Sequence, residues 1–306
     1  MTAEERTLSS EGAAPHLIGR PSELRDLTQS WRCRGYSVGL VPTMGALHLG
    51  HLSLIEAARK GCDRVVVSIF VNPLQFGPGE DFQLYPRQVE DDLLLLGKAG
   101  VDTVYRPLES DVYPSGFATR VMVESGLTAR WEGALRPGHF QGVATICCKL
   151  FALTGPCKGF FGEKDSQQAA LVTRLSQDLD LGMEIVVCPV VRQPDGLAVS
   201  SRNGRLSPEQ RRSALCLSRA LRAVGSGFAK GTRSGSALSE LARETIQGQA
   251  GASLDYAAVV DPGSFEDVEE VSPVSRVLVA ATIAGVRLID TALVGRPPAG
   301  EAGEAG

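Results

Sequence analysis

Two histidines, His48 and His51, follow an apolar run that ends at Val41, with Gly45 and Gly50 beside them. The run predicts a buried strand, and the apolar spacing after it predicts a helix whose first turn carries both imidazoles. Unpaired backbone N–H groups and the positive end of the helix dipole lie at such a start. The pattern favours a phosphate-binding turn in which histidines donate hydrogen bonds or protons. The alternative is a plain strand-to-helix turn with two surface histidines.

Amide side chains follow the next expected strand. A β-branched run over 64–71 is typical of a strand buried on both faces of a parallel sheet, and Asn72 and Gln75 come after it. Ligands bind beyond the carboxyl ends of such strands, which makes both amides candidate substrate groups, although an ordinary Asn-Pro turn also fits. A later helix opens with Asp91 and Asp92, which either complement the helix dipole or face Mg²⁺.

Three further segments carry cationic or hydroxyl groups. The Gly/Pro-rich loop 133–142 holds Arg136 and His139, and it is either a lid or anion clamp or a plain surface loop. Lys164 lies between a short strand and a helix, where it either meets phosphate or is simply solvated. The stretch 199–202 then places two serines and an arginine together in one loop.

The order of the expected elements predicts the fold class. Strands and helices alternate to about residue 190, which predicts an α/β fold with a doubly wound parallel sheet. The pattern then changes to helices followed by strands, so we expect domains at 1–190 and 191–306, the second a smaller α+β domain with a disordered tail from 296. The expected strands are 36–41, 64–71, 101–105, 119–123, 158–161, 183–187, 255–260, 276–283 and 286–290. One expected helix begins at Pro21. The other main expected helices cover 143–153, 208–230 and 236–249.

Composition narrows the class of protein. The 306 residues are 43% hydrophobic and 22% charged, and the net charge of -4 argues against a nucleic-acid surface. Neither a signal-peptide pattern nor an 18-residue apolar run occurs, so we expect a cytoplasmic protein without a membrane span. Seven cysteines without a C-x-x-C pair indicate reduced thiols. The dinucleotide motif G-x-G-x-x-G does not follow the first strand, and the P-loop motif G-x-x-x-x-G-K-[ST] does not occur, so a triphosphate site of another kind is favoured.

Taken together, the motifs identify a family resemblance. The sequence resembles the pantoate–β-alanine ligase family of the nucleotidyltransferase superfamily, which has a Rossmann-like fold and an H-x-G-H motif, over roughly residues 17–294. The segments that carry it are PTMGALHLGH (42–51), FVNPLQFGPGEDF (70–82), YPR (85–87), RPGHF (136–140), FFGEKD (160–165) with Gln167 and Gln168, and DGLAVSSRN (195–203).

The resemblance implies a two-step reaction that uses ATP with Mg²⁺ in coenzyme A biosynthesis. Pantoate attacks the α-phosphate to give pantoyl adenylate and pyrophosphate, and β-alanine then displaces AMP to give pantothenate. The implied catalytic residues are His48, His51, Lys164 and Arg202, with His51 as proton donor. The implied ATP site comprises Met44, Gly45, His48, Gly50, His51, Gly162, Glu163, Lys164, Asp165, Val191, Val199, Ser200, Ser201 and Arg202. The implied pantoate and β-alanine site comprises Asn72, Gln75, Arg136, His139 and Gln168. Asp92 and Asp91 are the implied Mg²⁺ neighbours, and a homodimer without nucleic-acid or membrane partners is implied.

Three positions depart from the family pattern: Ser166 where many relatives have Tyr, Val199 in place of Met, and Gln141 where some have Arg. They flank the expected site, so we expect altered rates or affinities rather than a different reaction. The competing hypotheses are another adenylyl- or cytidylyltransferase, a tRNA-charging enzyme and an inactive nucleotide-binding scaffold. Gln75 and Gln168 speak against the first, the acidic charge against the second, and the intact catalytic set against the third.

Overall fold

The computed structural model describes residues 14–124 and 126–299. This part of the chain divides into two compact units. The first comprises the segments up to Glu124, 132–162 and 168–188, and the second comprises 126–131, 163–167 and 189–299. Of the disordered tail expected from residue 296, residues 300–306 lie outside the described part of the chain.

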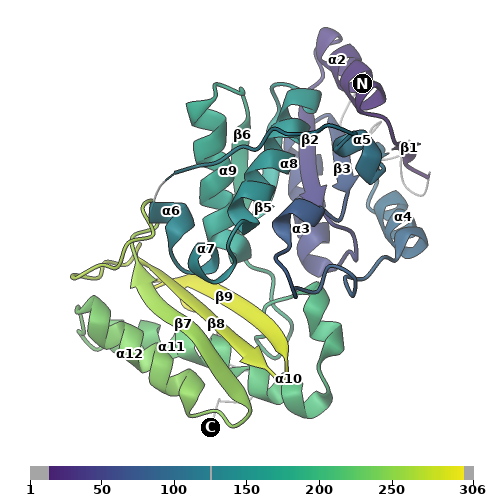
Figure 1. Ribbon diagram of the computed structural model, residues 1–306. Helices are drawn as coiled ribbons and strands as arrows, with labels where there is room; N and C mark the ends of the chain where they lie inside the picture. The colour runs from purple at the N-terminus through teal and green to yellow at the C-terminus, as the bar shows by residue number, and fades with distance from the viewer. Residues whose placement is uncertain (1–13, 125, 300–306) are drawn as a thin grey trace. The chain divides into compact units, whose positions relative to one another are not determined.

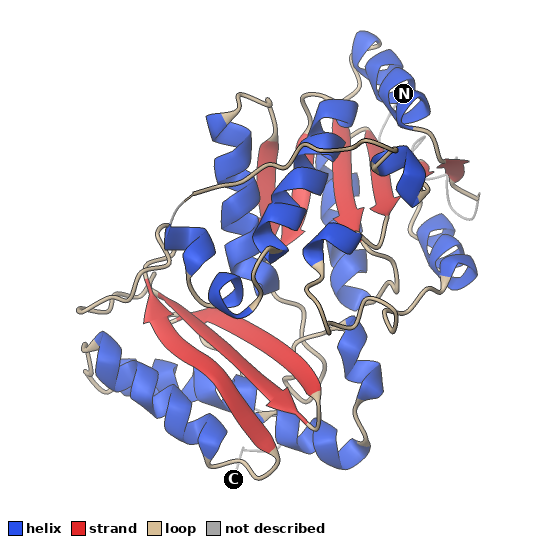
Figure 2. Cartoon of the chain, viewed as in Figure 1, coloured by secondary structure: helices blue, strands red, loops and turns tan. Residues whose placement is uncertain are grey.

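The first unit is built on a parallel sheet of six strands in the order β1-β4-β3-β2-β5-β6. Its strands are β1 (His16–Ile18), β2 (Val38–Thr43), β3 (Arg64–Ile69), β4 (Thr103–Tyr105), β5 (Lys158–Gly162) and β6 (Glu184–Cys188). Val66 and Val67 of β3 are both fully buried, as expected where successive side chains face opposite covered sides of the sheet. Figure 2 shows these strands running among helices. The expected α/β class and parallel sheet are confirmed.

The helices of the first unit connect these strands. They are α2 (Pro21–Cys33), α3 (Leu49–Gly61), the 3₁₀ helix η1 (Pro73–Gln75), α4 (Val89–Lys98), α5 (Glu109–Val112), α7 (Glu132–Leu135), α8 (His139–Thr154) and most of α9 (Ser166–Asp178). Helix α3 packs against strands β2, β3 and β5 (Figure 1). Strand β2 pairs with β3 on one side and with β5 on the other. The chain therefore reverses its direction of winding between β2 and β5, and such switch points are where open α/β sheets bind ligands.

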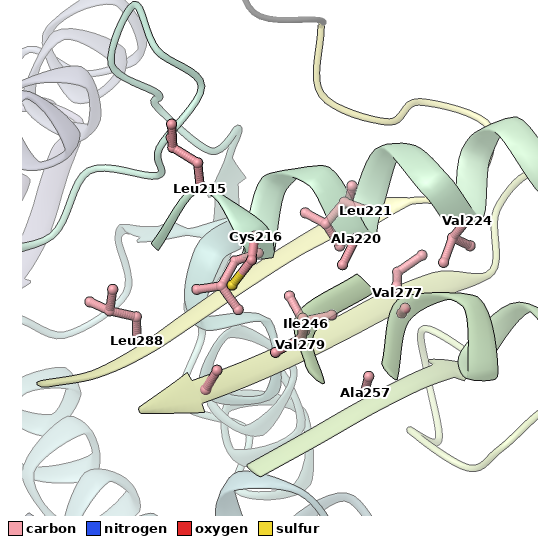
Figure 3. Packing of buried hydrophobic residues seen from close by; sticks show 14 of the residues in the cluster. Leu215, Cys216, Ala220, Leu221, Val224, Ile246, Ala257, Val277, Val279 and Leu288 are labelled. Carbon is pink, nitrogen blue, oxygen red and sulfur yellow. The ribbon is translucent and has the colours of Figure 1, made fainter. Parts of the chain in front are cut away.

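The second unit has its own antiparallel sheet, in the order β7-β8-β9. Its elements are α6 (Gly126–Ala129), η2 (Glu163–Asp165), η3 (Ser201–Arg205), α10 (Pro208–Ala214), α11 (Cys216–Ala229), α12 (Gly235–Gln247), β7 (Ala252–Val260), β8 (Arg276–Ile283) and β9 (Val286–Leu293). Leu221 of α11, Ile246 of α12 and Val279 of β8 belong to one buried cluster, which Figure 3 shows between helices and sheet. This core gives the second unit a hydrophobic centre separate from the sheet of the first.

Three expected elements differ in the structure. The expected strand 119–123 is absent from the described sheets, because the amide of Val121 bonds the hydroxyl of Thr145 at 3.0 Å instead of a neighbouring strand. The helix expected over 143–153 already begins at His139, after Gly138 at φ +83°. The helix expected over 208–230 is two helices that meet at Leu215. Within the described residues, no helix has the length and apolar character needed to span a bilayer.

Candidate active site

The turn after β2 brings the first predicted residues to the switch point. Gly45 has φ +81° and Ala46 has φ +51°, so the chain passes through the left-handed region at two successive positions. A Cβ on Gly45 would lie 2.9 Å from Oδ2 of Asp92, which leaves no room for a side chain. The hydroxyl of Thr43 accepts from the Gly45 amide at 3.1 Å and donates to the carbonyl of Ser68 at 2.7 Å. The turn is therefore fixed from both sides.

Asp92 holds this turn through backbone N–H groups. Its two carboxylate oxygens accept the backbone N–H groups of Ala46 at 2.9 Å and Leu47 at 2.8 Å, and the residue is only 2% exposed. Burial raises the pKa of Asp92, and the hydrogen bonds from Leu47 and Ala46 offset only part of that rise. Asp91, the preceding residue on α4, is exposed. The predicted pair of acids thus divides into a buried turn anchor and a solvated carboxylate.

The two histidines start helix α3 and stack on each other. His48 is the N-cap residue, its Nδ1 accepts from the Gly50 amide at 3.2 Å, and its own amide donates to Nδ1 of His51 at 3.4 Å. The ring centroids are 4.0 Å apart. An Nδ1 that accepts a hydrogen bond leaves the proton of a neutral imidazole on Nε2. Backbone contacts therefore assign both rings the tautomer that presents an Nε2–H donor.

A buried polar network surrounds Gln75. Asn72, only 1% exposed, donates to Oε1 of Gln75 at 3.1 Å and to the carbonyl of Gly142 at 3.1 Å. The hydroxyl of Tyr113 donates to Oδ1 of Asn72 at 2.7 Å. The amide nitrogen of Gln75 lies 2.9 Å from the sulfur of Met44. The first unit therefore brings three predicted residues together: Met44, Asn72 and Gln75.

Arg136 and His139 hold the backbone of Gln75. Nδ1 of His139 lies 2.9 Å from the Gln75 carbonyl, to which it donates, and Nη1 of Arg136 lies 3.1 Å from Nε2 of His139. Arg136 also pairs with Glu80, with nitrogen–oxygen distances of 2.8 and 2.7 Å. Burial and then the Arg136 charge lower the pKa of His139 to about 4. Burial alone would raise the pKa of Glu80, but the hydrogen bond and charge of Arg136 outweigh it and lower that pKa.

The remaining predicted groups belong mostly to the second unit. Strand β5 ends at Gly162, and turn η2 presents a half-buried Lys164. The amide of Val199 donates to the carbonyl of Val191 at 2.9 Å, directly before Ser200. Ser200 caps η3 by accepting the amide of Arg202 at 3.3 Å. Asp165 is exposed, Ser201 and Arg202 are half-buried, and Gln168 is half-buried on α9 in the first unit.

Comparison with known proteins decides the family. The profile of the family described as pantoate-beta-alanine ligase matches residues 16–293. The chain belongs to the pantoate–beta-alanine ligase family. It is 52% identical over 271 residues to a pantothenate synthetase of Acidobacterium capsulatum, covering 89% of this chain and 90% of that protein. The expected resemblance is confirmed, and the chain is a ligase that condenses pantoate with β-alanine.

Solved structures of the family share the fold. A crystal structure of pantothenate synthetase from Thermus thermophilus is 45% identical with a TM-score of 0.86, covering 91% of this chain and 99% of that one. A pantoate-beta-alanine ligase from Francisella tularensis, in complex with beta-gamma ATP and beta-alanine, is 34% identical with a TM-score of 0.77. The alignment covers 94% of this chain and 100% of the Francisella chain.

The sequence did not predict the observed roles of three residues of this ligase site. Tyr113 orients Asn72, Glu80 fixes Arg136, and Asp92 anchors the turn through backbone amides. Tyr113 lies in none of the quoted motifs, and although Glu80 belongs to the segment 70–82, its partner Arg136 lies far along the chain. Asp92 was noted for its charge, but only the folded structure shows which backbone groups its oxygens accept.

Proposed function

We propose that the chain makes pantothenate through a pantoyl-adenylate intermediate, with the turn after β2 as the centre of the first step. The observation that carries this proposal is the pair of stacked imidazoles at the switch point, with Nε2–H groups fixed by backbone hydrogen bonds. A carboxylate oxygen of pantoate attacks the α-phosphorus of ATP, and the bond to the pyrophosphate oxygen breaks. Fixed N–H donors stabilise the charge that develops on the phosphate oxygens.

We assign the other predicted residues by chemical type. His48 and His51 donate to phosphate oxygens, with His51 as the proton donor, while Met44, Gly45 and Gly50 line the ATP site. Further ATP-binding assignments are Gly162, Glu163, Lys164, Asp165, Val191, Val199, Ser200, Ser201 and Arg202. Among these, Lys164 and Arg202 supply positive charge to the triphosphate. In the second step, the amine of β-alanine attacks the acyl carbon, loses a proton, and AMP leaves.

We assign the pantoate hydroxyls to Gln75 and Gln168, because neutral amides bind hydroxyls and leave the carboxylate nucleophilic. Asn72 orients the Gln75 side chain, and Arg136 and His139 fix its backbone. The last two were expected to belong to the pocket itself. Their contacts with Glu80 and the Gln75 carbonyl support a positioning role instead.

Mg²⁺ is proposed to accompany ATP. Its predicted protein neighbours do not form a metal centre of their own: both oxygens of Asp92 accept backbone amides, and no group of three metal-binding side chains occurs among the described residues. Mg²⁺ usually keeps water and phosphate ligands, and such binding needs at most one or two carboxylates. We therefore propose that phosphate and water oxygens hold the metal, with the exposed Asp91 as its protein neighbour.

Three broader assignments remain proposals. The cytoplasm is proposed as the compartment because all seven cysteines are free thiols. A homodimer is proposed from the family resemblance. We propose ATP, pantoate and β-alanine as the binding partners, without nucleic acid or membrane, because the net charge of -4 does not favour a polyanionic surface.

Pyrophosphate exchange tests the reaction. With purified protein, labelled pyrophosphate should enter ATP when pantoate is present and β-alanine is absent, because adenylate formation is reversible. AMP should accumulate in step with pantothenate only after β-alanine is added. A panel of other hydroxy acids serves as the control. Exchange that does not depend on pantoate, or that is equal for all the acids, would contradict the assigned substrate.

A further inference from the structure

A short hairpin in the second unit carries the serine–arginine segment. The amide of Gln193 donates to the carbonyl of Leu197 at 2.9 Å, and that of Val199 donates to Val191 at the same distance. The chain then enters Ser200 and the turn η3 without an intervening residue. The position of Arg202 therefore depends on how the hairpin 191–199 is held.

An ion pair between a half-buried arginine and a buried carboxylate joins this hairpin to strand β9. Arg192 meets Asp290 through two parallel contacts, Nη1 to Oδ2 at 2.6 Å and Nη2 to Oδ1 at 2.8 Å. The same guanidinium donates to the carbonyls of Gly196 at 3.1 Å and Thr291 at 3.2 Å. Asp290 is 3% exposed, and a two-pronged arginine–carboxylate contact sets orientation as well as distance.

The next residue of β9 takes part in holding the lysine turn. Arg276 of β8 pairs with Glu163 at 2.9 Å and donates to the hydroxyl of Thr291 at 3.3 Å. Glu163 immediately precedes Lys164. The positive charge of Lys164 lowers the pKa of Asp290, against the rise that burial causes. Successive side chains of a strand point to opposite faces. Asp290 and Thr291 therefore connect two different segments to one strand, the yellow strand β9 of Figure 1.

We propose that Asp290, with Arg192 as its partner, is a positioning residue for the adenylation step. Through Thr291 and Arg276, the same strand fixes the turn that bears Lys164. This inference rests on the proposed assignment of Lys164 and Arg202 to the triphosphate. The two cations lie on half-buried 3₁₀ turns, which by themselves are weakly constrained. The partly buried contacts of Arg192 and Arg276 with β9 keep the two turns in a fixed relation.

The role predicts an effect on only one half-reaction. Arg192→Lys keeps the charge but loses the two-pronged geometry, and Asp290→Asn keeps the shape but loses the charge. Each variant should slow single-turnover adenylate formation about a hundredfold, as small misplacements of catalytic groups can do. Attack of β-alanine on synthetic pantoyl adenylate should change less than about twofold, because pyrophosphate and its charge have already left.

Asp255→Asn is the matched control. It removes the ion pair between Asp255 of β7 and Arg287 of β9, whose nitrogen–oxygen distance is 2.7 Å. Thermal unfolding identifies variants with comparable losses of stability. The control should leave both half-reactions within about twofold of the parent protein, since breaking a partly buried ion pair away from the site mainly lowers stability. If Arg192→Lys and Asp255→Asn slowed the same steps equally, the pair would be a structural element only, and the proposal would fail.

A double-mutant cycle tests the route through Arg202. If Arg192 acts by placing Arg202, then Arg192→Lys should add less than about threefold to the slowing in an Arg202→Ala background, because coupled sites are non-additive. Fully multiplicative slowing would contradict the proposal. Should Asp290→Asn fail to fold, this cycle still decides the question. Failure of the proposed function is separate, since the unaltered protein would then show no pantoate-dependent pyrophosphate exchange.

Discussion

The two units hold their proposed functional side chains in opposite ways. In the first unit, Gln75 is 9% exposed, and Asn72, Arg136 and His139 fix both its amide and its backbone. In the second unit, Lys164 and the serine–arginine segment lie half-buried on 3₁₀ turns that are held from their flanks. A group that recognises a neutral hydroxyl gains specificity from rigidity, because an unmatched buried amide is costly. Groups that meet transient phosphate charge need correct placement during one step.

The largest effect should come from the second unit. Lys164→Ala removes a charged donor, and pyrophosphate exchange should fall about 100- to 1,000-fold with little change in melting temperature. The exposed Lys230 provides the control, because Lys230→Ala removes the same charge elsewhere in that unit. Near-normal exchange in Lys164→Ala would show that Lys164 is not part of the site. The proposed contrast between the two units would then fail.

Arg202→Ala should divide the two half-reactions. We expect adenylate formation to slow about a hundredfold, because a guanidinium stabilises the developing phosphate charge. The attack of β-alanine on preformed adenylate should scarcely change. Single-turnover measurements of each step provide the test, with Arg205→Ala on the same turn as the control. Equal slowing of both steps would mean that Arg202 holds the adenylate or the fold.

The buried His139 of the first unit should make the free energy of unfolding depend on pH. The pKa of His139 is lowered to about 4, below the usual 6.5, so the unfolded chain binds the proton more readily than the folded one. The contribution to stability is therefore present above about pH 6.5 and lost as the pH falls towards 4. Between pH 7.5 and 4.5 the free energy of unfolding should drop by about 2–3 kcal/mol from this residue.

Urea unfolding at both pH values measures this drop. His139→Asn is the comparison, because its amide can still donate to the Gln75 carbonyl but does not titrate in this range. The drop should be about 2–3 kcal/mol smaller in His139→Asn than in the parent protein. Equal drops would show that His139 takes up its proton at the same pH in the folded and unfolded chain.

Neighbouring glutamines on α9 sharpen the same contrast. Gln168→Ala should raise the KM for pantoate about tenfold while leaving that for ATP nearly unchanged, as expected for a lost substrate hydrogen bond. Gln167 instead donates to the carbonyls of Leu127 and Arg130 at 2.9 and 3.0 Å. Gln167→Ala should therefore lower the stability of the protein rather than raise the KM for pantoate alone. An equal rise of both KM values in Gln168→Ala would assign Gln168 to structure.

The smallest effect should come from replacing Tyr113, which contacts Asn72. Tyr113→Phe deletes the 2.7 Å hydrogen bond to Asn72 and keeps the ring, so the KM for pantoate should rise about fivefold. Tyr36→Phe, whose ring lies under Arg64, is the control and should leave the KM unchanged. An unchanged KM in Tyr113→Phe would show that Asn72 orients Gln75 without help from the tyrosine.

Local patterns predicted the parallel sheet because β-branched runs such as 64–71 stay buried wherever the sheet places them. They failed at 119–123, since a strand also needs a neighbour, and Val121 finds the Thr145 hydroxyl instead. The helix was expected from 143, but its first turn includes His139, because Gly138 allows the chain to turn directly into it.

The candidate site shows the same limit. His48, Gln75 and Lys164 could be proposed from motifs that follow strands, because chemistry at strand ends is local in sequence. The partners that fix them could not be proposed, since Tyr113 reaches Asn72 across 41 residues and Asp92 reaches Ala46 across 46. Hydrogen bonds between distant segments leave no periodic pattern.

The close approach of helix α8 to turn η1 limits how this ligase could be redesigned. A Cβ on Gly142 would lie 2.2 Å from the Leu74 carbonyl oxygen, so the helix backbone rests directly on the turn that presents Gln75. A protein engineer who wants a different hydroxy acid accepted therefore has little freedom to lengthen or bend that turn. New acid preferences would have to come from exchanging side chains on an unchanged main chain.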